Sequence, residues 1–199
     1  DSFPDYSDAA IVVFSRAGGQ NSDIDYDPFN YLELDETEQE MMRQVCRLRD
    51  DGVFDRVVVI INATNPLEMT FLQDFQVDAC LLLGTPGQYG FNSLAEILAG
   101  KASPSGRLSD TWCYNNLAAP AMWNFTPQAY ENAIELGVPD NADTYQVYQE
   151  GIYVGYRYFD SFNVKPRYEF GFGRSYTTFE HTIENIAIDK DVVNVFVNV

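Results

Sequence analysis

The sequence predicts an α/β fold, a three-layer α/β/α sandwich in which a mostly parallel sheet lies between helices. Short, continuous apolar runs predict the strands, because parallel strands are buried on both faces and their side chains do not alternate. Segments with apolar residues at helical spacing lie between these runs, with capping or terminating residues at their ends. This order is typical of βαβ units, whose crossovers place helices on both faces of the sheet.

The first strand is predicted at residues 10–14, an apolar run that precedes a Gly-containing turn. The first helix is predicted at residues 36–51, where apolar side chains recur three and four residues apart. Asp35 stands at the position of an N-cap, whose side chain accepts the first free backbone N–H groups. Gly52 stands where a helix ends.

A β-branched run predicts the second strand at residues 57–61, and Asn65-Pro66 predicts a helix that begins there and continues through Phe75. The third strand is predicted at residues 79–83. The helix after it is predicted around residues 94–98 and ends at Gly100.

Residues 108–112 are a candidate edge strand, and regular patterns then fade from residue 114 to residue 149. A long irregular stretch in a compact domain is typical of a functional or wrapping loop. Strand-like alternation returns at residues 176–188 and 192–199. We therefore predict two domains, a sandwich over residues 1–173 that lacks its N-terminal part and an incomplete β domain over residues 174–199.

Composition and charge exclude several classes of function. The chain has 12 Lys and Arg against 30 Asp and Glu, a formal net charge of -18, which disfavours nucleic acid as a partner. No apolar run approaches the roughly 20 residues that a membrane span needs. Gly84, Gly87 and Gly90 lack the spacing of a nucleotide-binding loop.

The three cysteines, Cys46, Cys80 and Cys113, are far apart in the sequence and odd in number. They form neither the spacing of a metal site nor a complete set of disulfides, so no metal is expected. Unpaired thiols slightly favour a cytoplasmic location, although the compartment itself stays unknown.

Five blocks, taken together and in order, resemble the second domain of glycoside hydrolase family 3. They are AIVVFSRAGGQNSD, VVVIINATNPLEMTFL, VDACLLLGTPGQYGFNSLAEILAGKASPSGRLSDTW, YQEGIYVGYRYFD and YEFGFGRSYTTFE. The resemblance covers most of the chain between residues 10 and 180. It implies an α/β sandwich that has lost its first strand, followed by the start of a fibronectin type III-like domain.

The resemblance also implies a function. Active members of this family are retaining, exo-acting hydrolases such as β-glucosidases, which remove terminal non-reducing β-linked sugars without a cofactor. Their nucleophilic Asp belongs to an N-terminal TIM barrel, which this chain does not contain. The expected partners are therefore a carbohydrate substrate and the barrel of the same parent protein, and the isolated fragment is expected to be inactive.

The family's acid/base is a Glu in the loop after the strand predicted at residues 10–14. Here that loop reads SRAGGQNSD, and Gln20 stands where the Glu is expected. An amide cannot protonate a leaving glycosidic oxygen. Either Gln20 is an engineered replacement, or the acid is a neighbouring carboxylate, or the parent is a weakened or non-hydrolytic relative.

Asp23 is the first alternative acid, and Asp25 and Asp27 are close to it in the sequence. Closely packed carboxylates raise one another's pKa, as a general acid requires. Arg16, Asn21 and Asp25 are the residues of this loop that we predict to bind substrate, and Arg16 is also placed to pair with Asp23. The alternative to an enzyme is a non-catalytic carbohydrate-binding or structural module.

Overall fold

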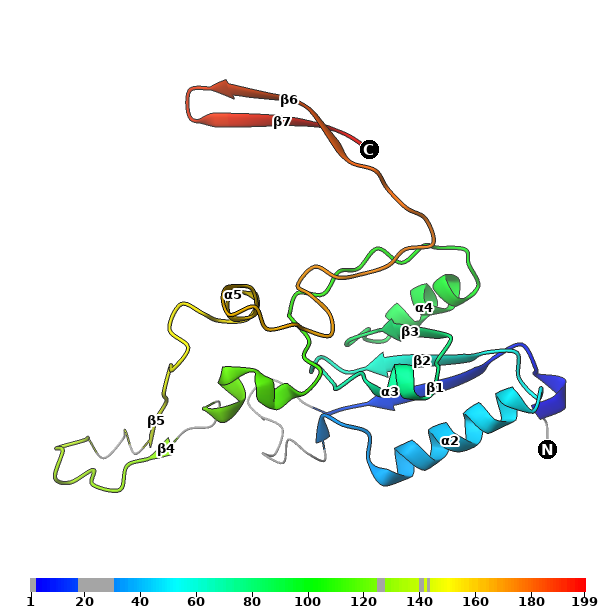
Figure 1. Ribbon diagram of the computed structural model, residues 1–199, viewed down its shortest axis with the longest axis horizontal. Coiled ribbons are helices and arrows are strands. Elements are labelled where there is room, and N and C mark those ends of the chain that lie inside the picture. Colours follow the sequence, from blue (N-terminus) through cyan, green and yellow to red (C-terminus); the bar gives the residue numbers. More distant parts are fainter. Residues whose placement is uncertain (1–2, 18–30, 125–127, 140–141, 143) are drawn as a thin grey trace.

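The computed structural model describes residues 3–17, 31–124, 128–139, 142 and 144–199 (Figure 1). In this part of the chain the central sheet has three parallel strands in the order β1-β2-β3. They are β1 (Ala10–Ser15), β2 (Val57–Asn62) and β3 (Ala79–Leu82). All three agree with the predicted strands to within one residue, which confirms the parallel α/β sheet.

The hydrophobic core lies against one face of this sheet. Its largest fully buried side chains are Phe14, Met42, Ile61, Leu67, Val57 and Val59. The ring of Phe14 meets that of Phe71 edge to face, with 5.7 Å between the centroids. Each apolar side chain of this size stabilises the fold by about 1.5–3 kcal/mol when it is fully buried, so this face anchors the sheet.

Helix α2 (Glu36–Asp50) covers this face of the sheet and forms where the sequence predicted it. The Asp35 side chain accepts the N–H of Glu38 at 2.7 Å, and the Glu38 carboxylate accepts the N–H of Asp35 at 3.1 Å. This reciprocal pair is a capping box, which satisfies two N–H groups that the helix leaves free. Gly52, with φ +78°, follows the end of the helix as predicted.

The helix predicted from Asn65-Pro66 through Phe75 is wrong over most of its length, because α3 comprises only Phe71–Asp74. The backbone before Phe71 instead forms hydrogen bonds with other segments of the chain. The carbonyl of Pro66 accepts the Asn116 side-chain amide at 3.1 Å. The N–H of Glu68 donates to the carbonyl of Leu32 at 2.8 Å. These tertiary contacts outweigh the local preference of Pro for a first helical turn.

Helix α4 (Gly90–Leu98) follows β3 and ends before Gly100, as predicted. The helical layer is complete only on the α2 side of β1. Ile11 and Val13, whose side chains alternate with the core residues of β1, are each 52% exposed. The described residues therefore leave the opposite face of β1 largely open.

Residues 168–176 form a strap along the segment that follows α4. Trp112 and Tyr168 form an isolated antiparallel bridge, and Leu108 exchanges hydrogen bonds with Phe172 and Gly171. The prediction of an edge strand at residues 108–112 is therefore corrected: this segment pairs with the strap and not with the central sheet.

In its described part, the stretch predicted to be irregular, residues 114–149, contains only short elements. They are η2 (Asn116–Ala118), η3 (Pro120–Trp123) and β4 (Gln128–Ala129), which pairs antiparallel with β5 (Thr144–Tyr145). The unpredicted helix α5 (Tyr156–Ser161) follows this stretch. A further short helix, η1 (Phe3–Asp5), precedes β1. The aromatic rings around α5 pack on one another, as in the pair Tyr153 and Phe162 with 5.2 Å between centroids.

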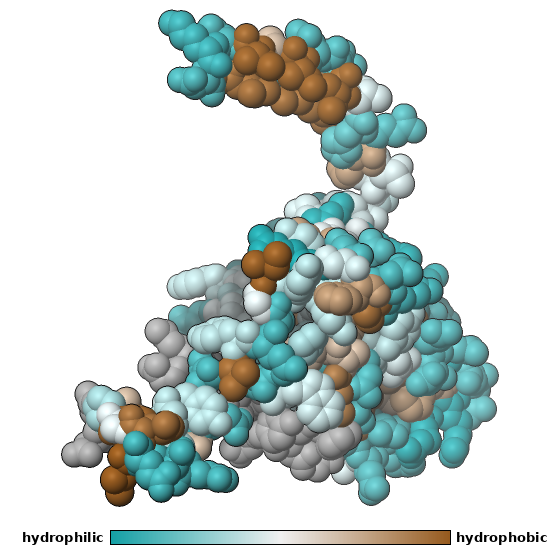
Figure 2. Space-filling view, turned by 60° about the vertical axis from the view of Figure 1, so that its left-hand side comes forward, coloured by the Kyte–Doolittle hydropathy of each residue, from teal (hydrophilic) through white to brown (hydrophobic). Residues whose placement is uncertain are grey.

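The C-terminal strands β6 (Thr182–Asp189) and β7 (Val192–Asn198) form an antiparallel hairpin that extends away from the sandwich (Figure 1). The first of these strands begins later than the predicted residue 176. Apolar side chains cover one side of the hairpin, shown in brown at the top of Figure 2. Those more than half exposed include Ile183, Ile186, Ile188, Val193 and Val195. The division into domains at residue 173 stays a prediction.

Candidate functional site

The carboxyl ends of β1 and β2 lie side by side and define the edge of the sheet where a site is expected. Ser15 pairs with Asn62 in the ladder, and the Asn62 side-chain amide donates to the Ser15 hydroxyl at 3.3 Å. In open α/β sheets, ligands bind at this end of the strands. The loop that the sequence singled out leaves the sheet here, directly after β1.

Most predicted site residues lie outside the described residues. Gln20, Asn21, Asp23 and Asp25 all belong to residues 18–30, for which no structure is described. Their catalytic and substrate-binding roles stay predictions. Arg16, the remaining member of the set, is described in detail.

The guanidinium of Arg16 uses all five of its N–H groups within the protein. Nε donates to the Tyr31 carbonyl at 2.5 Å, and Nη1 donates to the Ser15 carbonyl at 3.0 Å. Nη2 donates to the Glu33 carbonyl at 2.8 Å. The remaining two N–H groups reach the two carboxylate oxygens of Glu38, at 2.7 Å each. Direct binding of substrate by Arg16 stays a prediction, and it requires one of these contacts to break.

The carboxylate partner of Arg16 in the described structure is Glu38 and not the predicted Asp23, which lies outside the described residues. The Arg16 side chain is 7% exposed and that of Glu38 is 21% exposed. A fork-to-fork pair of this kind fixes direction as well as distance, because both ions are planar. It joins the end of β1 to the first turn of α2.

Tyr31 makes a second connection at the same place. Its hydroxyl donates to the Ala17 carbonyl, and its ring lies 5.7 Å from the guanidinium carbon of Arg16. Residues 17 and 31 are thus held together at the carboxyl end of β1. The predicted catalytic residues belong to the sequence between these two positions.

A pair of carboxyl groups that the sequence did not predict joins Glu68, in the loop after β2, to Glu33, which precedes α2. Glu68 accepts the backbone N–H of Asn116 at 2.6 Å, and its carboxyl is hydrogen-bonded to that of Glu33. Burial raises the pKa of the Glu68 carboxyl, the Asn116 N–H opposes this, and Glu33 raises the pKa further. The only sign of this pair in the sequence is an acidic residue between two apolar residues, Leu67 and Met69. Both of these are buried in the structure.

Cys113 lies close to this pair. Burial, with the charge of Glu68 as a smaller cause, raises the pKa of the Cys113 thiol to about 11. The thiol is therefore protonated at neutral pH, which makes it a poor nucleophile. In the part of the chain that the structure describes, no group of three His, Cys, Asp or Glu side chains is placed to hold a metal ion.

Glu150 and Arg157, which both belong to the YQEGIYVGYRYFD block, do not pair with each other. One carboxylate oxygen of Glu150 is buried without a hydrogen-bond partner, while the Arg157 guanidinium carbon lies 5.9 Å from the ring of Tyr156. The ring of Tyr156 packs against Phe170, with 5.3 Å between centroids. The aromatic residues of this block therefore pack against one another and the strap.

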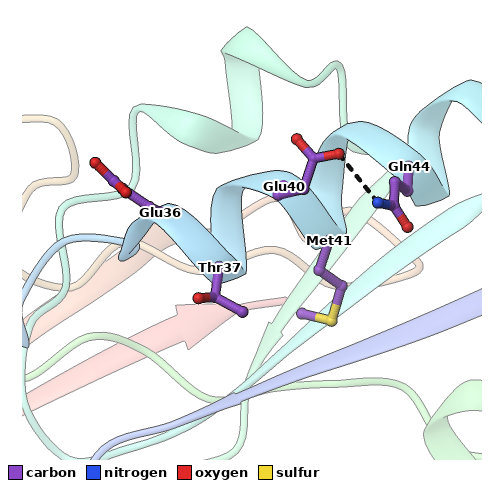
Figure 3. A pocket seen from close by; sticks show the side chains of 5 residues that line it. All are labelled: Glu36, Thr37, Glu40, Met41 and Gln44. Atoms are coloured by element: carbon purple, nitrogen blue, oxygen red, sulfur yellow. Dashed lines mark hydrogen bonds between the residues drawn. The ribbon is translucent and has the colours of Figure 1, made fainter.

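A shallow concavity of about 430 Å³ lies on the outer side of α2. Its lining residues, all on one face of that helix, are Glu36, Thr37, Glu40, Met41 and Gln44 (Figure 3). Gln44 donates to Glu40 at 3.0 Å, and this bond, followed by that from Arg43, lowers the pKa of the Glu40 carboxyl. A carboxylate held in its charged form is a poor general acid, so this concavity is the weaker candidate.

None of the helices within the described ranges is both long and apolar enough to cross a membrane.

Comparisons with known proteins agree on one family. The profile of the glycosyl hydrolase family 3 C-terminal domain matches residues 3–156. A β-glucosidase from Ruminococcus albus is 35% identical over 94% of this chain and 18% of its own length. A probable β-glucosidase D from Aspergillus niger is 34% identical over 93% of this chain and 21% of its own length. The chain thus spans about a fifth of these relatives.

Solved structures give the same result. The structure of β-glucosidase 3B from Thermotoga neapolitana in complex with α-D-glucose matches with a TM-score of 0.79 and 33% identity, over 98% of this chain and 25% of that one. A β-glucosidase from Kluyveromyces marxianus in complex with glucose matches with a TM-score of 0.71 and 27% identity, over 95% and 20% of the two chains.

Proposed function

The chain belongs to the glycosyl hydrolase family 3 C-terminal domain family, and from that membership we propose that it is one wall of the active site of a retaining, exo-acting β-glucosidase. The parent protein hydrolyses the bond of a terminal, non-reducing β-linked sugar. This domain supplies the acid/base loop and part of the sugar subsite, and the nucleophilic Asp comes from a TIM barrel in the rest of the parent.

The observation that carries the proposal is the place where residues 16–31 are anchored. Arg16 and Tyr31 hold both ends of this segment at the carboxyl end of β1, beside that of β2. This is the edge of an open α/β sheet at which ligands bind. The two solved β-glucosidases described above contain glucose, which supports a sugar as the ligand.

The chemistry requires two carboxyl groups about 5–5.5 Å apart. In the first step the barrel Asp attacks the anomeric carbon, and the glycosidic oxygen leaves with a proton from an acid in the loop. In the second step the deprotonated acid removes a proton from water, which attacks the anomeric carbon and releases the Asp. Gln20 occupies the position expected for that acid but carries no such proton. Asp23 is therefore the proposed acid of the natural loop, and Asn21 and Asp25 are proposed to hydrogen-bond sugar hydroxyls.

A second function has one observation in its favour. Because an amide stands at residue 20, the domain is alternatively a non-catalytic carbohydrate-binding or structural module of a degenerate relative. Such a module binds a sugar without protonating a leaving group.

One experiment distinguishes these two functions. The parent protein is incubated with 4-nitrophenyl β-D-glucoside, and the anomer of the sugar that is released first is identified by proton NMR. Release of the β-anomer of glucose is expected, because two displacements retain the configuration. Release of the α-anomer contradicts the proposed mechanism. Binding of glucose by calorimetry, without hydrolysis of any aryl β-glycoside, favours the non-catalytic module.

A further inference from the structure

We propose that Glu33 and Glu68 form a pH-dependent contact within the sandwich. One shared proton joins the segment that precedes α2 to the loop that follows β2, and loss of this proton separates the two segments. The contact is a conformational switch of the fold itself, and it does not depend on the proposed function.

Backbone hydrogen bonds bring the two carboxyl groups together. The N–H of Glu68 donates to the carbonyl of Leu32 at 2.8 Å, and Nη2 of Arg16 donates to the carbonyl of Glu33 at the same distance. The residues on either side of Glu33, Leu32 and Leu34, are both buried. The Glu33 carboxyl therefore reaches that of Glu68 from a backbone that is anchored in the fold.

The carboxyl of Glu68 has two kinds of partner. Its Oε1 accepts the backbone N–H of Asn116 at 2.6 Å, and the side-chain amide of Asn116, a buried residue, donates to the carbonyl of Pro66 at 3.1 Å. An amide N–H donates at every pH. A hydrogen bond between two carboxyl groups, in contrast, requires a proton on one of them, because a carboxylate only accepts. The contact with Glu33 therefore depends on pH, whereas the contact with Asn116 does not.

The charged groups around the pair do not neutralise it. The guanidinium of Arg16 reaches the Glu33 carbonyl, but its carboxylate partner is Glu38. Cys113 carries a protonated thiol, because burial and, to a smaller extent, the charge of Glu68 raise its pKa to about 11. None of the ion pairs within the described ranges includes Glu33 or Glu68. Two charged carboxylates would therefore repel each other here without a counter-ion.

The direction of the pH effect follows from the pKa of Glu68. Burial raises this pKa, the Asn116 N–H opposes the rise, and Glu33 raises the pKa further. A group with a raised folded pKa stabilises the fold below its unfolded pKa, about 4.3 for Glu, and this contribution is lost as the pH rises through the folded pKa. The contact is therefore closed in acid and opens as the pH rises.

A general loss of stability is the competing explanation. It predicts that all slowly exchanging amides lose protection by the same factor as the pH rises. A local opening predicts a loss confined to the joined segments. The N–H of Glu68, which donates to Leu32, then loses protection, whereas that of Val59, buried in the central strand β2, keeps it. The Asn116 N–H also keeps its protection, since its acceptor becomes fully charged.

The test is amide hydrogen exchange of the full-length parent at pH 5 and pH 8. Mass spectrometry with electron-transfer fragmentation resolves single amides, and each rate is divided by that of an unstructured peptide at the same pH. Glu68→Gln retains an oxygen for Asn116 and supplies an N–H to Glu33 at every pH. Glu33→Gln supplies the N–H from the other side, so it serves if the first variant fails to fold. Glu40→Gln, at an exposed carboxylate of α2, is the control.

We expect the protection of the Glu68 N–H in the wild type to fall by about tenfold or more between the two pH values, the factor that corresponds to one pKa unit. In both variants of the pair this protection is expected to stay constant, and the control is expected to match the wild type. An equal fall at Val59, no fall in the wild type, or the same fall in a folded variant of the pair overturns the proposal. None of these results depends on the hydrolysis of a sugar, so the proposed function is tested separately.

Discussion

Glu38 binds Arg16 through both carboxylate oxygens, and one of these oxygens also accepts the backbone N–H of Asp35. One side chain thus caps α2 and holds the base of the loop that follows β1. The stability of the helix N-terminus and the geometry of the candidate site are therefore coupled, and a change at Glu38 affects both.

Replacing Glu38 by Ala is expected to lower the free energy of unfolding by about 2 kcal/mol, because it removes a cap and leaves the Arg16 guanidinium without its anion. Urea unfolding of the parent protein measures the loss. Arg43→Ala, which breaks an exposed ion pair on the same helix, is the control and is expected to cost less than about 0.5 kcal/mol. Equal losses for the two variants contradict the assigned role of Glu38.

Gly173→Ala is expected to destabilise the strap by about 1–3 kcal/mol, a typical cost of overpacking. A Cβ on Gly173 overlaps the carbonyl oxygen of Gly106 and lies 2.6 Å from Nη1 of Arg107. Gly106→Ala is the matched control, since a Cβ there meets nothing within 4 Å. Thermal unfolding of the two variants gives the comparison, and a smaller effect at Gly173 than at Gly106 contradicts the described packing.

Glu68→Gln is expected to change the pH dependence of stability. The pKa of Glu68 is raised in the folded state, so its contribution to stability is fully present below the unfolded pKa of about 4.3 and is lost as the pH rises through the folded pKa. The Gln variant retains an oxygen for the Asn116 N–H but carries no charge. Its melting temperature is therefore expected to rise relative to the wild type between pH 4 and pH 7.

Glu40→Gln is expected to change the pH dependence of stability in the opposite direction. The pKa of Glu40 is lowered, chiefly by Gln44, so the contribution of Glu40 is present above the unfolded pKa and is lost as the pH falls. The Glu40 variant is expected to become less stable relative to the wild type over the same rise in pH. If the difference between Glu68→Gln and the wild type does not change with pH, the raised pKa of the Glu68 carboxyl is contradicted.

The Cys113 thiol is expected to resist alkylation in the folded protein. It is buried, and its pKa of about 11 leaves little thiolate at pH 8. Iodoacetamide labelling followed by mass spectrometry is expected to modify Cys113 only after denaturation in urea. Rapid modification of Cys113 in the native protein, at a rate similar to that in urea, rules out the described environment.

Local patterns were sufficient to predict the parallel strands and α2. The β-branched run of β2 and the capping residues Asp35 and Gly52 act over one turn or one strand, so their effects are visible in the sequence. The helix predicted from Pro66 failed because the Asn116 side chain, far along the chain, binds the Pro66 carbonyl. Residues 108–112 paired with the strap instead of the sheet for a similar long-range reason.

The position of the candidate site in the fold could be predicted from the sequence, but the contacts among its residues could be predicted only in part. The loop after β1 follows from the order of the strands and from the resemblance to a family. The pairing of Arg16 with Glu38 does not follow from the sequence, because Glu38 lies 22 residues away and also belongs to a capping box. The Glu33 and Glu68 pair was not predicted, because the two residues lie in loops that follow different strands. They come close only in the folded chain, and no local sequence pattern indicates this contact.

The most direct test of the acid/base role of the loop is the hydrolysis of a β-glucoside with a poor leaving group by Gln20→Glu and Asp23→Asn variants of the full-length parent. General acid catalysis contributes about 10²–10⁴-fold, so we expect a change of that order in kcat/KM, as a gain in the first variant or a loss in the second. If neither variant differs from the wild type, while the wild type hydrolyses the substrate, the proton comes from elsewhere and the proposed role of this loop is wrong.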